Sequence, residues 1–330
     1  MEIAKALILA GNGSDDCSWP VVSGSRHLFP IANRPILFHN LEALRTAGIL
    51  EATILAEPEA GEAIERAVGD GSNWNLTVRH AAWRSSEGLP GALAVAAGRD
   101  FLRGEPVLVE HGDALLRERM RVHVSAFARE RLDALALRLE QTAPEAPELT
   151  PGYLFSPRAV SMLLENHDDA ANPVAGLRAG GGRVRVQNVD GCLPCHGNLE
   201  ALIESNRRML ERHASDVDPA CLEDSTVHGA VEIHPTAKVR RSLLRGPVVV
   251  GPGATVTDAY IGPYTSIGAG VVVEGSEIEH SIVLPDAQLR FVGSRLESSV
   301  IGRGARVVRG FALPAAMRVS LGDGAEVVLR

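Results

Sequence analysis

Two polar segments directly follow apolar runs and carry residues that can hold anions or metals. Gly11–Ser14 follows Ala6–Ala10, and His111–Asp113 follows Pro106–Glu110. A glycine-rich backbone offers open N–H groups to a phosphate, whereas carboxylates and imidazoles bind metal ions. If both apolar runs are strands of one parallel sheet, their carboxyl ends meet at the edge where such sheets bind ligands.

The first 220 or so residues have the pattern that would build such a sheet, because short apolar runs alternate with amphipathic stretches. The predicted strands are Ala6–Ala10, Ala52–Ala56, Leu76–His80 and Pro106–Glu110. A helix is expected between Pro35 and Gly48, since leucines recur there at helical spacing, proline suits a first turn and glycine a C-terminal end. This alternation predicts an α/β domain of Rossmann-like type, with a mixed, mostly parallel sheet and helices on both faces.

From about Val227 the pattern changes to a repeat of 17 residues. Apolar residues followed by glycine or proline and then a small residue begin at Ile233, Val250, Ile267, Leu284 and Ile301. A second apolar series runs through Val239, Val256, Val273 and Val307, with Arg290 interrupting it, and a third through Leu244, Ile261 and Ile278. One aliphatic side chain per face predicts a three-sided parallel β-helix of hexapeptide type. We expect two domains, residues 1–222 and 223–330.

The amino-acid composition of the chain argues against some classes of function. The chain has 330 residues and a net charge of -8, which argues against nucleic acid as a partner because phosphate backbones need a basic face. No apolar stretch is long enough to cross a bilayer, and the opening apolar run is short and preceded by Glu2, so it is interpreted as a buried strand and not a signal peptide. Four cysteines are too few for a disulfide framework, and a cytoplasmic protein is expected.

Several segments, in collinear order, carry a family resemblance. They are Lys5–Gly11, Leu28–Ile36, Leu41–Ile49, Gly112–Leu116, Gly152–Pro157, Asn198–Asn206 and, in the tail, Gly262–Gly268. Together they resemble the sugar-1-phosphate nucleotidylyltransferases, most closely the long-form glucose-1-phosphate thymidylyltransferases with a C-terminal left-handed β-helix. In that family a sugar 1-phosphate attacks the α-phosphorus of a nucleoside triphosphate and releases pyrophosphate, so the site must gather anions and neutralise charge.

The resemblance also assigns roles to residues of this chain. It implies nucleotide or substrate binding by Gly11, Gly13, Ser14, Trp83, Gly112 and Gly152, binding of Mg²⁺ by Asp113, and a charge-neutralising catalytic role for Arg26. Other readings stay open. The two loop glycines are equally explained by a tight turn, Asp113 by capping of the next segment, and Trp83 is interpreted as packing in preference to base stacking.

Most of the charged residues that the family's chemistry requires are replaced. Asp16 falls where the catalytic arginine of the glycine loop belongs, and Arg26 stands in place of a lysine, with a different geometry. The lysine that holds the sugar phosphate aligns with Gln141, and the second magnesium aspartate aligns with Cys195. Ala170–Gly180 contains no match to the segment that reads sugar hydroxyls.

The energetic cost of the change from arginine to aspartate can be estimated from the charges involved. A unit charge about 4 Å away contributes roughly 4 kcal/mol at an effective dielectric near 20. Exchanging a favourable charge for an unfavourable one therefore costs several kcal/mol, on the order of a thousandfold or more in rate, and Asp15 adds to the repulsion. Mg²⁺ follows from the resemblance, but the loss of its second carboxylate argues against it.

Cys195 and His196 offer a different chemistry in the same place. If Cys195 occupies the position of the family's aspartate, it lies near Asp113 and His111. A thiolate, imidazoles and a carboxylate suit zinc or another soft metal, or they make a cysteine nucleophile with an adjacent base. Free cysteine is also a common buried apolar residue, and the spacing matches no standard zinc motif.

The leading hypothesis is a nucleotidylyltransferase homologue that has lost most of its ancestral reaction. It would bind a nucleotide, sugar phosphate or sugar nucleotide, or a protein partner, for example in natural-product sugar metabolism. The runner-up is an enzyme, acting through Asp113 and Arg26 or through a repurposed Cys195 and His196. The third hypothesis is a structural assembly protein built through the β-helix. The family resemblance also implies a homo-oligomer formed through the flanks of the β-helix.

Overall fold

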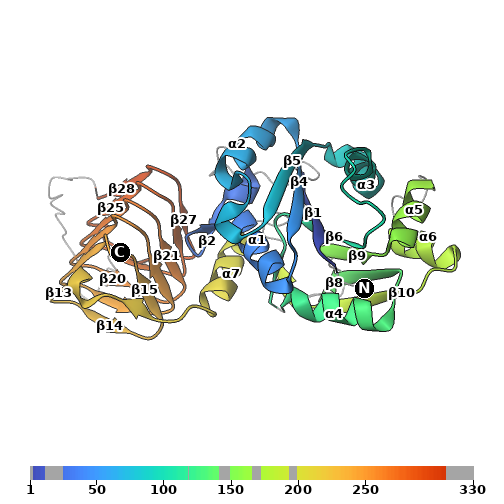
Figure 1. Ribbon diagram of the computed structural model, residues 1–330. Coiled ribbons are helices and arrows are strands. Elements are labelled where there is room, and N and C mark those ends of the chain that lie inside the picture. Colours follow the sequence, from blue (N-terminus) through green and yellow to red (C-terminus); the bar gives the residue numbers. More distant parts are fainter. Residues whose placement is uncertain are drawn as a thin grey trace, which may run out of the picture.

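The computed structural model describes residues 3–11, 25–117, 119–140, 149–165, 172–192 and 199–309. Figure 1 shows two parts, an α/β part and a β-helix, with helix α7 (Leu199–Leu210) and strand β2 (Pro30–Ile31) at their junction. Within these described ranges, no helix combines the length and the apolar character needed to traverse a bilayer.

The α/β part is built on one sheet with the order β10-β8-β9-β6-β1-β4-β5. Its strands are β1 (Lys5–Ala10), β4 (Glu51–Ala56), β5 (Thr77–Ala82), β6 (Val107–His111), β8 (Ala134–Leu139), β9 (Gly152–Phe155) and β10 (Val184–Val189). All pairs are parallel except those of β9, which runs antiparallel to β6 and β8. The predicted mixed, mostly parallel sheet is confirmed, with strand ends shifted by one or two residues.

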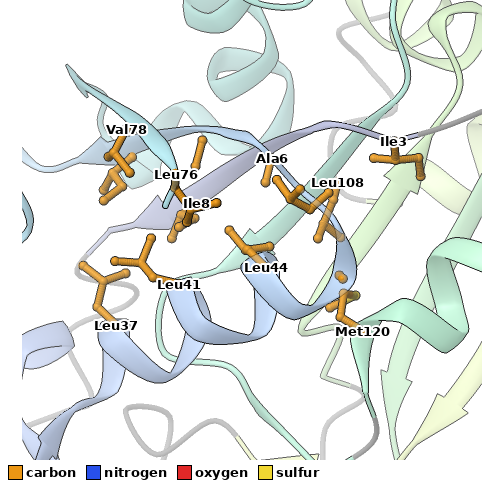
Figure 2. Close-up of a cluster of buried hydrophobic side chains, with 14 of the residues drawn as sticks. Ile3, Ala6, Ile8, Leu37, Leu41, Leu44, Leu76, Val78, Leu108 and Met120 are labelled. Atoms are coloured by element: carbon orange, nitrogen blue, oxygen red, sulfur yellow. The ribbon is translucent and has the colours of Figure 1, made fainter. Parts of the chain in front are cut away.

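Helices cover both faces of this sheet. On one face lie α1 (Ile36–Ala47), α2 (Pro58–Val68) and α4 (Met120–Glu130), and on the other α3 (Gly88–Gly98), α5 (Pro157–Glu165) and α6 (Pro173–Ala179). Figure 2 shows Leu41 and Leu44 of α1 packed beneath Ala6 and Ile8 of β1. The predicted helix is confirmed, and Gly48 ends it because its φ of 90° is favourable for glycine alone.

The second part is a β-helix whose short strands stack into three parallel sheets. One sheet has the order β12-β15-β18-β21-β24-β27, with β12 (Asp216–Val217), β15 (Val231–Ile233), β18 (Val248–Val250), β21 (Thr265–Ile267), β24 (Ile282–Val283) and β27 (Val300–Ile301). The second contains β13 (Leu222–Glu223), β16 (Lys238–Arg240), β19 (Thr255–Thr257), β22 (Val272–Glu274), β25 (Gln288–Arg290) and β28 (Arg306–Val308). The third contains β14 (Thr226–His228), β17 (Leu243–Arg245), β20 (Tyr260–Ile261), β23 (Glu277–Glu279) and β26 (Leu296–Glu297). The predicted β-helix is confirmed, whereas the boundary at residue 222 remains a prediction.

The strict 17-residue register is wrong in one coil. Val273 pairs with Leu289, 16 residues later, and Leu289 pairs with Val307, 18 residues later. One coil is thus a residue short and the next a residue long, so Leu289 points into the apolar interior and Arg290 does not interrupt the series. In the same coil Val283, and not Leu284, stacks on Ile267.

The shifted coil contributes to the junction between the two parts. Ile282 and Leu284 leave the β-helix interior and join a buried cluster with Phe29, Ile31, Ile36, Leu115 and Leu202. Leu202 belongs to α7, and Ile31 to a β-hairpin formed by β2 and β3 (Arg34–Pro35). The β-helix therefore docks on the α/β part through a continuous apolar contact.

Candidate functional site

A cavity of about 280 Å³ opens at the carboxyl ends of β1 and β6. The described residues that line it are Leu9, Gly11, Arg26, His27, Trp83, Ser85, Gly88, Leu89, Val109, Glu110, His111, Asp113, Gly152, Tyr153 and Pro173. Among the residues predicted for the site, the structure brings Gly11, Arg26, Trp83, His111, Asp113 and Gly152 around this one cavity. Gly13, Ser14, Asp16, Gln141, Cys195 and His196 lie outside the described residues.

Arg26 is the only lysine or arginine among the described residues that line the cavity. It begins a short 3-10 helix (Arg26–Leu28), and its Nη2 donates a hydrogen bond of 2.6 Å to the carbonyl oxygen of Gly11. The next residue, His27, is buried against Gly112, where an added Cβ would lie 3.1 Å from the imidazole Cδ2. The guanidinium is therefore held across the end of β1.

The opposite side of Gly11 is covered by side chains. A Cβ added to Gly11 would lie 2.9 Å from the Cβ of Ser85 and 2.9 Å from Cζ3 of Trp83. Trp83 is only 6% exposed and belongs to a hydrophobic cluster with Leu9. The geometry supports packing as the role of Trp83, and it requires glycine at position 11.

Glu57 is a supporting residue that sequence reasoning missed. It is buried at the start of α2, and its Oε1 accepts two hydrogen bonds from Ser85, one from the backbone N–H at 2.8 Å and one from the hydroxyl at 2.6 Å. The connection after β4 thereby holds the segment that covers Gly11. The single sequence signal for it was an acidic residue directly after a mostly apolar strand.

Asn40 is a second supporting residue that was missed. From α1 its Nδ2 donates hydrogen bonds to the carbonyl oxygens of His111, at 3.2 Å, and Ala114, at 2.9 Å. These two carbonyls flank Gly112 and Asp113, so the amide fixes the turn that carries the carboxylate. His111 and Asp113 both line the cavity, as expected for neighbours at the end of one strand.

Two buried carboxyl groups, those of Glu110 and Asp113, line the cavity. Burial raises the pKa of Glu110 to about 8, against the effect of a hydrogen bond from the Asn40 side chain that lowers it. Burial therefore favours the protonated form of Glu110, and that form is a poor ligand for a metal ion. Asp113 is buried as well and is the carboxylate that the family resemblance assigns to Mg²⁺.

The described residues do not fit a two-carboxylate magnesium site. Among the described residues that line the cavity, the other carboxyl beside Asp113 is that of Glu110, whose burial favours the protonated form, and Mg²⁺ prefers ionised carboxylates together with phosphate oxygens. Among the described residues no group of three or more histidine, cysteine, aspartate or glutamate side chains has the geometry of a metal site. The soft-metal hypothesis for Cys195, His196, His111 and Asp113 stays a prediction, since its two central residues are outside the described ranges.

The far end of the cavity is formed by Gly152, Tyr153 and Pro173. Gly152 pairs with Glu110, and an added Cβ would lie 2.9 Å from the carbonyl oxygen of Val109, so strand pairing excludes a side chain there. Burial raises the pKa of the Tyr153 hydroxyl, which stays a neutral hydrogen-bonding group. This end is compact, neutral and partly apolar.

Comparisons with known proteins identify relatives of this chain. Residues 5–147 match the family model described as nucleotidyl transferase. The chain is 34% identical to a glucose-1-phosphate thymidylyltransferase of Streptomyces griseus, over 97% of this chain and 98% of that protein. It is 30% identical to the enzyme of the same name from Streptomyces antibioticus, over 99% of each.

Two more distant matches follow, one in sequence and one in structure. A low-salt glycan biosynthesis nucleotidyltransferase, Agl11 of Haloferax volcanii, is 27% identical over 98% of this chain and 100% of that protein. A solved structure from Bacillus anthracis, described as a glucose-1-phosphate thymidylyltransferase, superposes with a TM-score of 0.53 at 19% identity. It covers 65% of this chain and 97% of that one, and at this identity it supports the fold alone.

Proposed function

Because the chain belongs to the sugar-1-phosphate nucleotidylyltransferase family, we propose that its cavity binds a nucleotide, a sugar phosphate or a sugar nucleotide, while nucleotidylyl transfer is lost or strongly impaired. The observation that carries this proposal is the scarcity of cations. Arg26 is the sole permanently charged cation among the described lining residues, and its guanidinium already donates to the Gly11 carbonyl.

The family's reaction needs more positive charge than this arrangement supplies. Negative charge builds on the transferring phosphoryl group and on pyrophosphate, and enzymes of this kind offset it with several fixed cations. Each unit charge within about 4 Å is worth roughly 4 kcal/mol at the effective dielectric of a partly buried site. One arginine can hold one phosphate group, which favours binding over cleavage of a triphosphate.

The packing around Gly11 supports the same proposal. Trp83 and Ser85 lie against its Cα, so part of the space beside the end of β1 is filled by the chain's own side chains. The cavity of about 280 Å³ lies just below the usual range of ligand pockets, roughly 300–1,000 Å³. A ligand the size of a sugar phosphate suits it better than a complete set of reactants.

In the bound state, Arg26 would pair with the ligand's phosphate and Tyr153 would offer a neutral hydroxyl to its polar groups. Asn40 would keep the His111–Asp113 turn in place through the two carbonyl oxygens that it bonds. Trp83 and Leu89 would exclude water from the apolar side of the ligand. These roles hold a ligand in place. Unlike the family's reaction, they do not require the site to stabilise negative charge that develops on a transferring phosphoryl group.

Pyrophosphate release tests the loss of activity. The purified protein is incubated with a panel of nucleoside triphosphates, glucose 1-phosphate and Mg²⁺, beside the Streptomyces griseus relative as a positive control. We expect at least about a thousandfold lower rate, the deficit that several kcal/mol of lost charge stabilisation produces. Turnover equal to that of the relative would refute the proposal.

A variant that restores the family's charged residues tests the cause of the lost activity in the same assay. Asp16→Arg, Gln141→Lys and Cys195→Asp together restore the charges that the family pattern has at these positions. We expect the triple variant to release pyrophosphate faster than the wild type, whereas Asp15→Asn alone, which removes a neighbouring charge without restoring a cation, has a smaller effect. No gain in the triple variant would mean that the missing charges are not the cause.

Binding is tested separately by thermal shift with dTTP, glucose 1-phosphate and dTDP-glucose. A ligand at a hundred times its dissociation constant adds about 2.7 kcal/mol of stability. Arg26→Ala is the matched control and should reduce the shift, with weaker binding that stays measurable. No shift with any ligand would favour the structural hypothesis, in which the β-helix drives assembly.

A second candidate function is an enzyme with repurposed chemistry, supported by the joint presence of His111 and Asp113 at the cavity. With Cys195 and His196 these residues would hold zinc. Elemental analysis of the protein as purified tests this candidate. Stoichiometric zinc that is lost in Cys195→Ser would support it, and metal-free protein would remove the metal version of this hypothesis.

A further inference from the structure

The junction between the two parts contains one fully buried amide that joins three segments. Asn206 lies on α7, and its Oδ1 accepts hydrogen bonds from the backbone N–H of Ala32, at 2.8 Å, and from the hydroxyl of Ser266, at 2.7 Å. Its Nδ2 donates to the carbonyl oxygen of Tyr264 at 3.2 Å. Ala32 belongs to the α/β part, while Ser266 and Tyr264 belong to the β-helix.

The hairpin that Asn206 holds has a strained turn. Ala32 and Asn33 join β2 to β3 with φ values of 49° and 62°, in the left-handed region that non-glycine residues rarely adopt. Such a conformation persists where surrounding contacts hold it. Here Asn206 of α7 supplies one such contact and the β-helix supplies another, since Asn33 Nδ2 donates to the carbonyl oxygen of Ile267 at 2.7 Å.

The same hairpin is bonded to the helical turn that carries the cavity's arginine. The N–H of Phe29 donates to the carbonyl oxygen of Arg26 at 3.1 Å, and the carbonyl oxygen of Phe29 accepts from Ile36 at 3.0 Å. Phe29 is buried among apolar residues that include Ile282 and Leu284 of the β-helix. A displacement of the hairpin would therefore move Arg26.

We propose that the β-helix is a positioning element of the cavity, and that Asn206 is the residue through which it holds the hairpin and thereby Arg26. This proposal rests on the proposed function, in which Arg26 binds the ligand's phosphate. Asn206 is a positioning residue because it contacts no residue that lines the cavity in any of the three hydrogen bonds above. The apolar contact supplies adhesion between the parts, and the amide sets their register, as buried polar groups do in other interfaces.

The test uses the full chain with Asn206→Leu, which keeps the branched shape of the side chain and removes the three hydrogen bonds, and with Ser266→Ala, which removes one of them. The matched control is Ser276→Ala. Ser276 is another buried β-helix serine whose hydroxyl donates to the carbonyl oxygen of Glu274, away from the junction. Hydrogen exchange of peptides covering residues 25–36 reports on the hairpin without any ligand.

We expect faster exchange at residues 25–36 in Asn206→Leu, a smaller effect in Ser266→Ala and none in Ser276→Ala. Isothermal titration with glucose 1-phosphate should show about a tenfold weaker affinity for Asn206→Leu, the loss given by one hydrogen bond of ordinary strength. On an Arg26→Ala background the same substitution should cause no further loss. A general loss of stability would not produce that dependence on Arg26.

Unchanged exchange of residues 25–36 in Asn206→Leu would overturn the proposal, and so would an equal affinity loss on the Arg26→Ala background. Failure of the wild type to bind glucose 1-phosphate would count against the proposed function for that ligand. In that case the exchange experiment still decides whether Asn206 holds the hairpin. If Asn206→Leu does not fold, the comparison of Ser266→Ala with Ser276→Ala decides it.

Discussion

A single carboxylate oxygen, Oε1 of Glu57, accepts both the backbone N–H and the hydroxyl of Ser85. Ser85 is two residues beyond Trp83, and both side chains lie against Gly11. Glu57 directly follows β4, so this pair ties the connection after one strand to the segment that covers the end of another. The cavity wall at Gly11 therefore depends on Glu57.

Replacing Glu57 by leucine should lower the free energy of unfolding by about 2–4 kcal/mol, because the half-buried N–H and hydroxyl of Ser85 lose their shared acceptor. The Trp83 segment should also loosen. Urea unfolding measures the first effect, and acrylamide quenching of tryptophan fluorescence measures the second. Glu57→Gln keeps an Oε1 acceptor and serves as the control, with less than half of the stability loss. Equal losses in the two variants would show that the charge of Glu57, and not its acceptor geometry, is what matters.

Trp83 offers a test of packing against hydrogen bonding. Its Nε1 is buried and has no hydrogen-bond partner among the described residues, so this polar group contributes nothing favourable to the folded state there. Trp83→Ala should cost about 3–5 kcal/mol of stability through the cavity that it leaves. Trp83→Phe keeps most of the apolar contact and should cost about 1 kcal/mol or less. Comparable losses in urea unfolding would mean that the indole N–H does have a partner in the protein.

The shifted coil of the β-helix predicts unequal effects at two neighbouring positions. Leu289→Ala should destabilise the β-helix by about 2–5 kcal/mol, since it empties an interior position, whereas Arg290→Ala should cost about 1 kcal/mol or less. Arg290 instead pairs with Glu274 at a partly exposed site, at 3.1 Å. Thermal unfolding of both variants decides between the two registers. A larger loss in Arg290→Ala would favour the strict 17-residue spacing.

That coil marks the limit of what the sequence could predict about the fold. The alternation of strands and helices and the repeat of the tail are local patterns, so both could be predicted. The position of Leu289 could not, because a coil can lose one residue at a corner while the next gains one, and neither change alters the spacing of the flanking repeats. Only the stacking of Val273, Leu289 and Val307 reveals it.

The candidate site likewise contains some residues that the sequence could predict and others that it could not. Gly11, His111 and Asp113 could be predicted because ligand residues of a parallel sheet follow its strands directly. Glu57 and Asn40 could not, since each acts across a large sequence separation, on Ser85 and on the turn after His111. The sequence contained only a weak indication of Glu110, which is a charged residue at the end of an apolar run. Its burial raises its pKa and so favours the protonated form.

His39 predicts how stability depends on pH. Burial lowers its pKa from the ordinary value of 6.5 to about 4, with smaller contributions in the same direction from Arg34 and His213, and against the hydrogen bond between Nε2 and the carbonyl oxygen of Ile31. Above 6.5 the imidazole is neutral in both the folded and the unfolded chain. Between 6.5 and 4 the unfolded chain binds a proton that the folded chain does not, so the free energy of unfolding falls as the pH falls.

The expected loss is about 2 kcal/mol between about pH 7.5 and about pH 5, and no more than about 3 kcal/mol in all. Urea unfolding across this range measures it, and His39→Gln is the control because an amide can still donate to Ile31 but does not titrate. Other groups titrate in both proteins, so the difference between the two pH profiles isolates His39. If the wild type and His39→Gln lose stability in parallel as the pH falls, His39 is protonated in the folded protein. The junction beside the Ile31 hairpin would then tolerate a charge that its burial should exclude.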